Sequence, residues 1–468
     1  MIVEQLYTNC LSEAAYFIAS EGEAAIIDPI RDIGPYIALA KQHHAEIKYI
    51  FETHFHADFL SGHLELAAKT GAKIIYGPET KAHFDFYKAG DGEIFPLGKI
   101  TLQALHTPGH TLESTCYLLA DEQRQPYCIF TGDTLFVGDV GRPDLFSGNL
   151  SKEALAGMMY DSLNTKIKTL PDTVIVYPAH GPGSACGKSL GKETFTTIGA
   201  QKDLNYALRA ASKEEFIRQV TDGLKEAPVY FALNAKMNGQ NVPTLASVLS
   251  HSLKAMTADE VDAARKNEIW LLDVRNPEDF TAEFVPDSIN IGLNGRFAEW
   301  AAKLIPFDRH IILVADEGKA EEAVTRLARV GFHKVLGYLD GGVPAWKSAG
   351  KPVDMIIDVT AGELAIDLPF DKKMAVIDVR NDAEFAAGHV QGAQQVALET
   401  LLDPVVMAQL DDEKNMYVHC AGGYRSVMAC SLMKRQGYNN LRNVLGGWAR
   451  MKQEAGLPLV LPASGQEA

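Results

Sequence analysis

A repeated pattern in the second half of the chain constrains its fold more than any other sequence feature. Residues 272–280 return as residues 377–385 with a shared Asp-Val-Arg-Asn core, and Gly341-Gly342 returns as Gly446-Gly447 at the same offset. Apolar strand ends followed by glycine-rich turns indicate two copies of one small α/β domain. The connection between the copies, around residues 351–354, is short, so we expect them to pack side by side.

The first half of the chain lies outside this repeat. Its apolar strands alternate with turns and helical patterns, which predicts a layered α/β domain. Because 468 residues are too many for one hydrophobic core, we predict three domains: 1–252, 253–354 and 355–468. The expected strands of the first domain are 24–29, 47–51, 73–76, 100–105, 127–130 and 173–177.

Metal-ligand side chains crowd the end of the predicted strand 47–51. His54, His56 and Asp58 follow it, and a helix is predicted over residues 64–70. Open α/β folds place their chemistry on such strand-to-helix loops. Imidazole suits zinc, iron or copper, and carboxylate admits iron or manganese. A metal site is therefore expected here.

Three further strand ends carry residues of the same kind. His110, Asp133 and His180 each come shortly after a predicted strand. A single histidine on a loop is usually solvated, but several ligand-type residues that recur in order at strand ends favour one shared site.

Composition excludes several classes of partner. The formal net charge is −16, whereas nucleic acid and anionic membranes require a basic face. No apolar run reaches the length of a membrane span, and the N-terminal residues lack the features of a signal peptide. We therefore expect small-molecule partners, no nucleic acid, no membrane and a cytoplasmic location.

The six cysteines are too few and too scattered for a disulfide framework. Cys420 lies between a predicted strand, 416–419, and a predicted helix, 426–436. A cysteine at a helix N-terminus beside an arginine is expected to be a thiolate at neutral pH, and loop amides can stabilise a persulfide sulfur. The residues that would form this sulfur-cradling loop are Ala421, Gly422, Gly423, Tyr424 and Arg425.

The first copy of the repeat lacks this chemistry. Its corresponding strand, 311–314, runs into Ala315 and an acidic loop, and no cysteine occurs from 187 to 419. We interpret this copy as a spacer or docking platform for the active one.

Two interpretations of Cys186 stay open. It follows His180 in a glycine-rich loop, and nearby Lys188 can favour a reactive thiolate that handles persulfide. Free cysteines are nevertheless usually inert. The other cysteines are expected in the core: Cys10, Cys116, Cys128 and Cys430.

The first half of the chain resembles the metallo-β-lactamase superfamily in the order of its ligand-type residues: His54, His56, Asp58, His110, Asp133 and His180. This resemblance implies an αββα sandwich with metal at the strand ends. Dinuclear hydrolases of the superfamily, such as glyoxalase II, carry a histidine directly after the aspartate of the motif. Here that residue is Phe59, which cannot ligate, so a single-metal enzyme is favoured.

Among single-metal members the chain is similar to persulfide dioxygenases fused to rhodanese. The resemblance implies one Fe(II) per chain, held by His54, His110 and Asp133, with open positions for a persulfide sulfur and O2. Three residues would then orient the ligands by hydrogen bonds or persist as remnants of the motif: His56, Asp58 and His180.

The two repeats resemble rhodanese domains through Asp378-Val379-Arg380 and Gly446-Gly447-Trp448. Related phosphatase loops are generally one residue longer than the span from Cys420 to Arg425, which fits sulfur better than phosphate. We therefore expect Cys420 to be the catalytic sulfur carrier, with Arg425 as its partner.

Together the resemblances imply oxidation of low-molecular-weight persulfides to sulfite and thiol, coupled to sulfur transfer in sulfide detoxification. The implied partners are a glutathione or coenzyme A persulfide, O2, and sulfite or thiosulfate, in a homo-oligomer. Two alternatives stay open: a dinuclear zinc thioester hydrolase like glyoxalase II, and a non-catalytic persulfide carrier or sensor.

Overall fold

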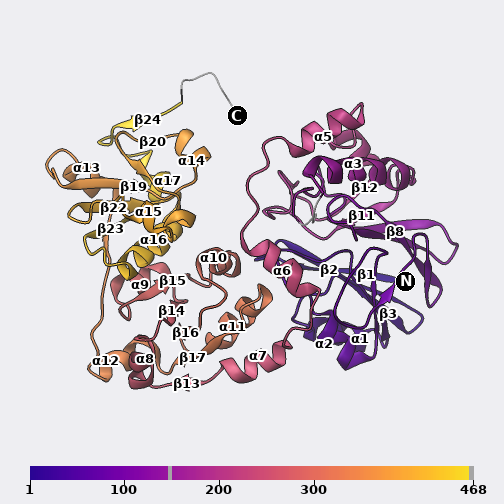
Figure 1. Ribbon diagram of the computed structural model, residues 1–468, viewed down its shortest axis with the longest axis horizontal. Coiled ribbons are helices and arrows are strands. Elements are labelled where there is room, and N and C mark those ends of the chain that lie inside the picture. Colours follow the sequence, from indigo (N-terminus) through magenta and orange to yellow (C-terminus); the bar gives the residue numbers. More distant parts are fainter. Residues whose placement is uncertain (146–149, 463–468) are drawn as a thin grey trace. The chain divides into compact units, whose positions relative to one another are not determined.

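The computed structural model describes residues 1–145 and 150–462 (Figure 1). The chain divides into two compact units. Unit 1 comprises Met1–Val248 together with Thr325–His333, and unit 2 comprises Leu249–Val324 and the chain from Lys334 onward.

Unit 1 is built on two six-stranded sheets, with strand orders β1-β2-β3-β4-β5-β6 and β12-β11-β10-β9-β8-β7. The strands of the first sheet are β1 (Ile2–Thr8), β2 (Glu13–Ser20), β3 (Glu23–Ile27), β4 (Glu46–Phe51), β5 (Lys73–Tyr76) and β6 (Tyr87–Lys88). Those of the second are β7 (Ile94–Leu97), β8 (Ile100–His106), β9 (Thr115–Ala120), β10 (Pro126–Gly132), β11 (Ile175–Pro178) and β12 (Thr196–Thr197).

The two sheets of unit 1 face each other across a shared core. Tyr16 and Phe51 from the first sheet pack with Leu102 and Phe130 from the second, and all four are almost completely buried. Apolar burial of this kind is the main force that holds stacked sheets together.

Helices cover the outer faces of both sheets. The first helices along this unit are α1 (Gly34–Gln42), α2 (His63–Thr70), α3 (Lys152–Ser162), the π-helical turn η1 (Leu163–Ile167), α4 (Ile198–Leu204) and α5 (Lys213–Thr221). Helix α2 packs on β4 and β5, while α3 and α5 cover the second sheet through a core that includes Met159, Val176 and Phe216 (Figure 1). The expected αββα layering is therefore confirmed.

The predicted strands of the first domain are all present, as β3, β4, β5, β8, β10 and β11. The predicted helix after the metal-ligand cluster is α2, which ends at Gly71 with a φ of 76° and a bond from its N–H to Ala67 O. This left-handed position suits glycine. The sequence analysis did not identify the hairpin of β1 and β2, because β2 is buried along its whole length and shows no alternation.

Unit 2 contains two five-stranded parallel sheets of matching order, β13-β17-β16-β14-β15 and β18-β23-β22-β19-β21. The first holds β13 (Ala255–Met256), β14 (Trp270–Asp273), β15 (Ser288–Asn290), β16 (Ile311–Val314) and β17 (Val335–Leu339). The second holds β18 (Ile357–Val359), β19 (Met374–Asp378), β21 (Gln394–Gln395), β22 (Asn415–His419) and β23 (Leu441–Val444), and β20 (His389–Val390) pairs with β24 (Leu459–Val460). The predicted duplication is confirmed.

The remaining helices follow in chain order. They are α6 (Tyr230–Asn238), α7 (Leu245–Ser252), α8 (Ala258–Ala264), α9 (Pro277–Ala282), α10 (Phe297–Leu304), α11 (Ala320–Arg329), α12 (Gly342–Ser348), α13 (Ala361–Asp367), α14 (Asp382–Ala386), the 3-10 turn η2 (Leu398–Thr400), α15 (Pro404–Met407), α16 (Tyr424–Arg435) and α17 (Gly447–Met451). No helix in the described part of the chain is long and apolar enough to cross a membrane.

The two copies in unit 2 pack side by side, as the short connection predicts. Helix α16 of the second copy lies against β15 of the first, and the Asn290 N–H donates to Ser431 Oγ at 3.0 Å.

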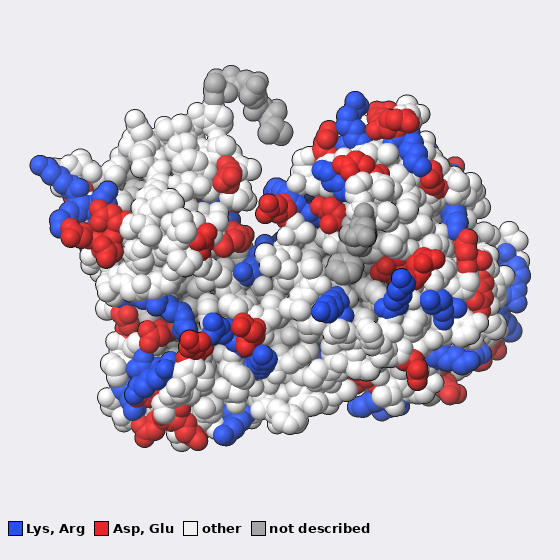
Figure 2. Space-filling view, in the orientation of Figure 1, with Lys and Arg blue, Asp and Glu red and all other residues white. Residues whose placement is uncertain are grey.

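On the face drawn in Figure 2, acidic and basic side chains intermingle without a broad basic area.

Candidate metal centre

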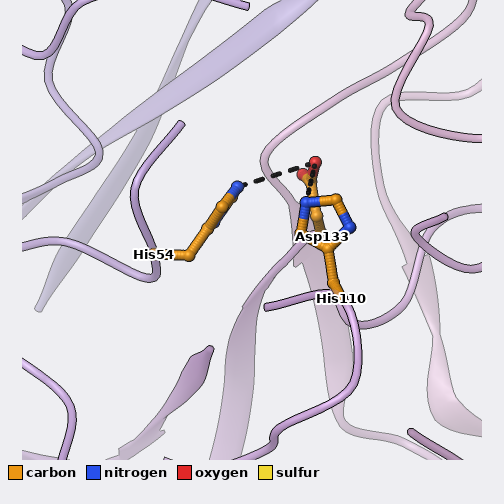
Figure 3. Close-up of side chains that lie close together, drawn as sticks. All are labelled: His54, His110 and Asp133. Atoms are coloured by element: carbon orange, nitrogen blue, oxygen red, sulfur yellow. Dashed lines mark ion pairs between the residues drawn. The ribbon is translucent and has the colours of Figure 1, made fainter. Parts of the chain in front are cut away.

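His54, His110 and Asp133 meet at one point in unit 1, although they follow different strands (Figure 3). His54 Nε2 lies 3.7 Å from Asp133 Oδ2, and His110 Nε2 lies 3.4 Å from the same oxygen. All three side chains are buried. The loop after β4 in one sheet and the loops after β8 and β10 in the other bring them together.

The spacing of these atoms fits a single metal ion. Ligand atoms about 2.1 Å from a shared ion lie roughly 3 to 4 Å apart, which matches the two distances. Asp133 Oδ2 has no hydrogen-bond partner among the described residues, and a buried carboxylate oxygen without a partner is costly unless something binds it. Two imidazoles and one carboxylate are the ligands of the 2-His-1-carboxylate class of iron sites.

A chain of hydrogen bonds fixes how His54 faces the centre. The Thr53 hydroxyl donates to Asp28 Oδ2 at 2.8 Å, so its oxygen is left to accept from His54 Nδ1 at 2.9 Å. The Nδ1–H tautomer then presents the Nε2 lone pair to the centre. His110 is fixed in the same way, because its Nδ1 lies 2.8 Å from the carbonyl oxygen of Arg142.

The protonation of the site also suits a metal. Burial, reinforced by neighbouring His56, holds the pKa of His54 well below its usual value, and burial lowers the pKa of His110. Burial opposes ionisation of Asp133, but the imidazoles of His180 and His54 lower the pKa of this carboxyl below its ordinary range. Neutral imidazole and ionised carboxylate are the forms that bind metals.

His56 does not point at this centre. Its Nε2 lies 3.2 Å from Asp28 Oδ1 and 3.6 Å from Glu52 Oε2, and all three groups are buried. The sequence analysis did not identify Asp28 and Glu52. Their places in the sequence could have indicated them, because Asp28 directly follows β3 and Glu52 directly follows β4.

His180 lies between two carboxylates. Its Nδ1 is 2.7 Å from Asp133 Oδ1, and its Nε2 is 2.9 Å from Asp58 Oδ2. Burial disfavours the imidazolium, but Asp133 and Asp58 raise the pKa of His180 well above its usual value. His180 therefore donates to one oxygen of Asp133 and leaves the other oxygen for the centre.

Asp58, His180 and Cys186 form a second group whose potential ligand atoms lie within 4.8 Å of one another. Phe59 lies next to this group and is fully buried. Its ring stacks on that of His56, with the two ring centroids 4.3 Å apart, and its centroid lies 6.4 Å from that of His180. A buried apolar ring that cannot ligate a metal therefore lies beside this group.

The expected influence of Lys188 on Cys186 is wrong. Burial, together with the charges of Asp58 and Asp133, raises the pKa of the Cys186 thiol well above its usual value. The Lys188 ammonium donates to the carbonyl oxygens of Gln219 and Asp222. The thiol lies beside Asp58 and His180, and among the described residues no cation contributes to lowering its pKa.

The other cysteines follow the prediction with one exception. Cys116, Cys128 and Cys430 are buried. Cys10 is partly exposed and lies in the turn between β1 and β2. A tight turn places its residues at the surface, so the prediction of a core position for Cys10 is wrong.

The loop that follows Asp133 packs against two of the candidate ligands. Arg142 and Asp144 form an ion pair at 2.6 Å, and the guanidinium also donates to the carbonyl oxygens of Ala185 and Lys225. A Cβ at Gly141 would lie 2.0 Å from Asp133 O and 2.8 Å from His110 Nδ1. Only glycine can therefore occupy this position without moving two of the candidate ligands.

Cys420 lies in unit 2 at the end of β22, and its side chain is buried. The Gly423 N–H donates to Cys420 Sγ at 3.1 Å. Arg425 forms a two-pronged pair with Glu384, with contacts of 2.6 and 2.8 Å. The guanidinium therefore braces the loop through Glu384.

The structure explains why the repeat has a glycine at position 447 in the second copy. Gly447 has a φ of 52°, and a Cβ there would lie 2.3 Å from Cys420 O. The next residue, Trp448, donates its backbone N–H to that carbonyl oxygen at 2.7 Å. Gly447 thus lets the chain pass close to Cys420, and the Trp448 N–H holds the cysteine's carbonyl oxygen.

The first copy has the corresponding strand and loop but no cysteine at this position. Ala315 follows β16 where Cys420 follows β22. It lines a cavity of about 1090 Å³ whose charged lining residues are Arg275 and six acids: Asp279, Glu283, Asp316, Glu317, Glu321 and Asp340. The interpretation of this copy as a spacer or docking platform for the active copy stays a prediction.

Comparison with known proteins agrees with this architecture. Residues 8–180 match the family model of the metallo-beta-lactamase superfamily, and residues 257–349 and 361–454 match the model of the rhodanese-like domain. A hydroxyacylglutathione hydrolase from Polaromonas sp. is 30% identical over 246 residues, which cover 47% of this chain and 89% of that relative.

Two solved structures are also similar. A metallo-beta-lactamase from Staphylococcus aureus subsp. aureus COL shares 32% identity, covers 72% of this chain and 98% of its own, and superposes with a TM-score of 0.65. ETHE1 from Myxococcus xanthus shares 29% identity over 51% of this chain and 100% of its own, with a TM-score of 0.44. The chain therefore belongs to the metallo-β-lactamase superfamily, and two rhodanese-like domains follow its metallo-β-lactamase domain.

Proposed function

We propose that the metallo-β-lactamase domain is a non-haem Fe(II) persulfide dioxygenase and that Cys420 performs sulfur transfer. One observation carries the first part of this proposal: His54, His110 and Asp133 converge on one point while Phe59 takes the place of a further imidazole. The reaction is RSSH + O2 + H2O giving RSH, sulfite and two protons.

The residues around the three proposed ligands have definite tasks. Iron held by such a set would supply redox chemistry with O2 and keep coordination positions open on one side. Thr53 fixes the His54 tautomer, and His180 holds one oxygen of Asp133. The burial of these side chains excludes water, which strengthens electrostatic interactions in the site.

The proposed substrate is the persulfide of a small thiol. The Polaromonas relative is named for a glutathione derivative, which supports glutathione as the carrier, with coenzyme A as the other member of this class. Cys186, buried beside Asp58 and His180, is proposed as a neutral contact for the incoming sulfur.

At Cys420 the proposed intermediate is a cysteine persulfide. Sulfite attacks its outer sulfur, the S–S bond breaks, and thiosulfate leaves while Cys420 keeps the electron pair as a thiolate. A thiol acceptor would instead yield a new persulfide. The Gly423 N–H, 3.1 Å from Sγ, supports the anionic sulfur at the start and end of each cycle.

A thioester hydrolase with two zinc ions is the second candidate. The group of Asp58, His180 and Cys186 could hold another ion, and the Polaromonas relative is named as a hydrolase. The two candidates differ in the number and kind of metal ions, and in whether O2 is consumed.

The experiment is elemental analysis of the full chain, combined with an oxygen electrode and glutathione persulfide as substrate. We expect one iron per chain and steady O2 consumption, and we expect His54→Ala to lose both while sulfur transfer persists. His83→Ala, at an exposed histidine, is the matched control. Two zinc ions with thioester hydrolysis, or O2 consumption that survives His54→Ala, would overturn the proposal.

A further inference from the structure

We propose that a hydrogen-bonded relay starting in the cysteine-less copy positions the Cys420 loop for sulfur transfer. Its members, in order from the first copy to the sulfur, are Thr281, Asp358, Asn443, Ser426 and Cys420. The inference rests on the proposed sulfurtransferase function and assigns positioning roles to residues that do not touch the sulfur's reaction partners.

The relay meets the loop at Ser426. This side chain is fully buried, and its hydroxyl lies 2.9 Å from Gly423 O, 2.6 Å from Asn443 Oδ1 and 3.7 Å from Cys420 Sγ. Gly423 has a φ of 108° and donates its N–H to Sγ. The single Ser426 hydroxyl hydrogen goes to Asn443 Oδ1 at 2.6 Å, so Ser426 Oγ is left to accept from the Cys420 thiol at 3.7 Å.

Asn443 gives the relay a fixed direction. Its side chain is buried, and Nδ2 donates to Asp358 Oδ1 at 2.7 Å. Because an oxygen of the Asp358 side chain accepts from Nδ2, the amide oxygen of Asn443 faces the other way. Its Oδ1 must face Ser426 and accept the hydroxyl hydrogen at 2.6 Å.

The first copy supplies the outer end of the relay. Thr281, on α9, is buried and donates to Asp358 Oδ2 at 2.6 Å. The two oxygens of Asp358, an exposed residue, therefore accept from different copies. The first copy also accepts a hydrogen bond from Tyr424 Oη to Gly292 O at 2.7 Å, so it reaches the loop at two points.

Packing alone does not hold this side of the loop. A cavity of about 260 Å³ lies between the copies, lined by Thr281 and Asn294 from the first and by Gly422, Tyr424 and Asn443 from the second. Where side chains leave such a space, polar contacts across it contribute to the position of the loop. A copy without a cysteine would thus be retained as a structural part of the sulfur-transfer site.

The test compares Thr281→Val, which removes only the hydroxyl, with Thr281→Ser, which keeps it. The full chain is assayed with thiosulfate as sulfur donor and cyanide as acceptor. For Thr281→Val and Asp358→Asn we expect kcat to fall about five-fold with KM for thiosulfate unchanged, because Cys420 is mispositioned while donor binding is intact. Thr281→Ser should stay within about two-fold of the wild type in kcat.

Two outcomes would overturn the relay. One is an unchanged kcat for Thr281→Val. The other is an equal fall for Thr281→Val and Thr281→Ser accompanied by a lower unfolding temperature in both, which would assign Thr281 to the general stability of the interface.

A second measurement separates this inference from the proposed function. The rate at which iodoacetamide alkylates Cys420, followed by mass spectrometry of the full chain, requires no sulfur transfer. We expect Thr281→Val to slow it and Thr281→Ser to leave it unchanged. If the wild type transfers no sulfur yet Thr281→Val slows alkylation, the proposed function fails and the relay stands; identical alkylation rates in all three proteins would refute the relay.

Discussion

Phe59 is the residue on which the number of metal ions depends. It is fully buried against His56, next to the group of Asp58, His180 and Cys186. A phenyl ring offers no lone pair to a metal, whereas an imidazole at this position would complete a second set of ligands.

We predict that Phe59→His raises the metal content from one ion per chain towards two, because it restores a nitrogen donor beside Asp58 and His180. Elemental analysis after dialysis against the metal measures the effect. Phe59→Leu, which also removes the ring but adds no donor, should keep one ion. Two ions already present in the wild type would contradict the prediction.

A second prediction at this scale concerns His63, whose Nδ1 lies 3.1 Å from Glu52 Oε1. Burial lowers the pKa of His63 to about 3, against about 6.5 in an unfolded chain. At a pH between these two pKa values, His63 is protonated in the unfolded state and neutral in the folded state. The free energy of unfolding therefore falls as the pH drops below about 6.5. At pH 5 the loss is about 2 kcal/mol.

His63→Asn should therefore reduce the difference in unfolding temperature between pH 7.5 and pH 5, measured on the metal-free full chain. The matched substitution His83→Asn removes an exposed histidine and should leave that difference as it is in the wild type. A difference that is the same in all three proteins would mean that His63 is protonated in the folded state.

At the scale of elements, the metal centre is a product of loops. Strands β4, β8, β10 and β11 end at neighbouring positions of two facing sheets, and the loops that follow them carry the proposed ligands and the histidine that holds Asp133. Loops placed by a rigid scaffold often carry function in this way. The positions of the ligand side chains therefore depend on close contacts with neighbouring backbone, such as the contact of Gly141 with Asp133 and His110.

We predict that Gly141→Ala lowers metal affinity by about ten-fold or more, the range seen when the surroundings of ligands are disturbed. The added methyl group would push against Asp133 O and His110 Nδ1. Gly90→Ala, whose Cβ would meet only Glu93 Oε2 at 3.6 Å, is the matched control. Competition with a chelator measures the affinity, and equal values for both variants would count against this role of Gly141.

At the scale of the whole molecule, two proposed chemistries lie in separate units. The three-residue metal centre belongs to unit 1 and the Cys420 loop to unit 2. Units with cores of their own can lose one activity and retain the other.

Cys420→Ser should abolish sulfur transfer from thiosulfate to cyanide, because serine cannot carry a sulfane sulfur, while sulfite production from added glutathione persulfide continues at the wild-type rate. Both are measured on the same preparation, with Cys10→Ser as the control at a partly exposed cysteine in the turn between β1 and β2. Loss of both activities in Cys420→Ser would refute this division of labour.

The sequence predicted the architecture because local patterns carry it. Strand periodicity, the glycine after α2 and the internal repeat each depend on neighbouring residues, and all three agree with the structure. The order of ligand-type residues likewise marked His54, His110 and Asp133, since each follows a strand end. The sequence did not identify Asp28 and Glu52, because a lone carboxylate after a strand has no distinctive spacing.

Sequence alone thus determined which residue types stand at the strand ends and that the second half is duplicated. Only the tertiary structure decided where each side chain points: His56 turns to Asp28 and Glu52, Lys188 turns away from Cys186, and Asn443 connects Ser426 to the first copy through Asp358. These outcomes depend on burial and on pairings between residues far apart in the chain. A buried polar group takes whichever partner the packed fold brings within reach, and sequence spacing does not encode that choice.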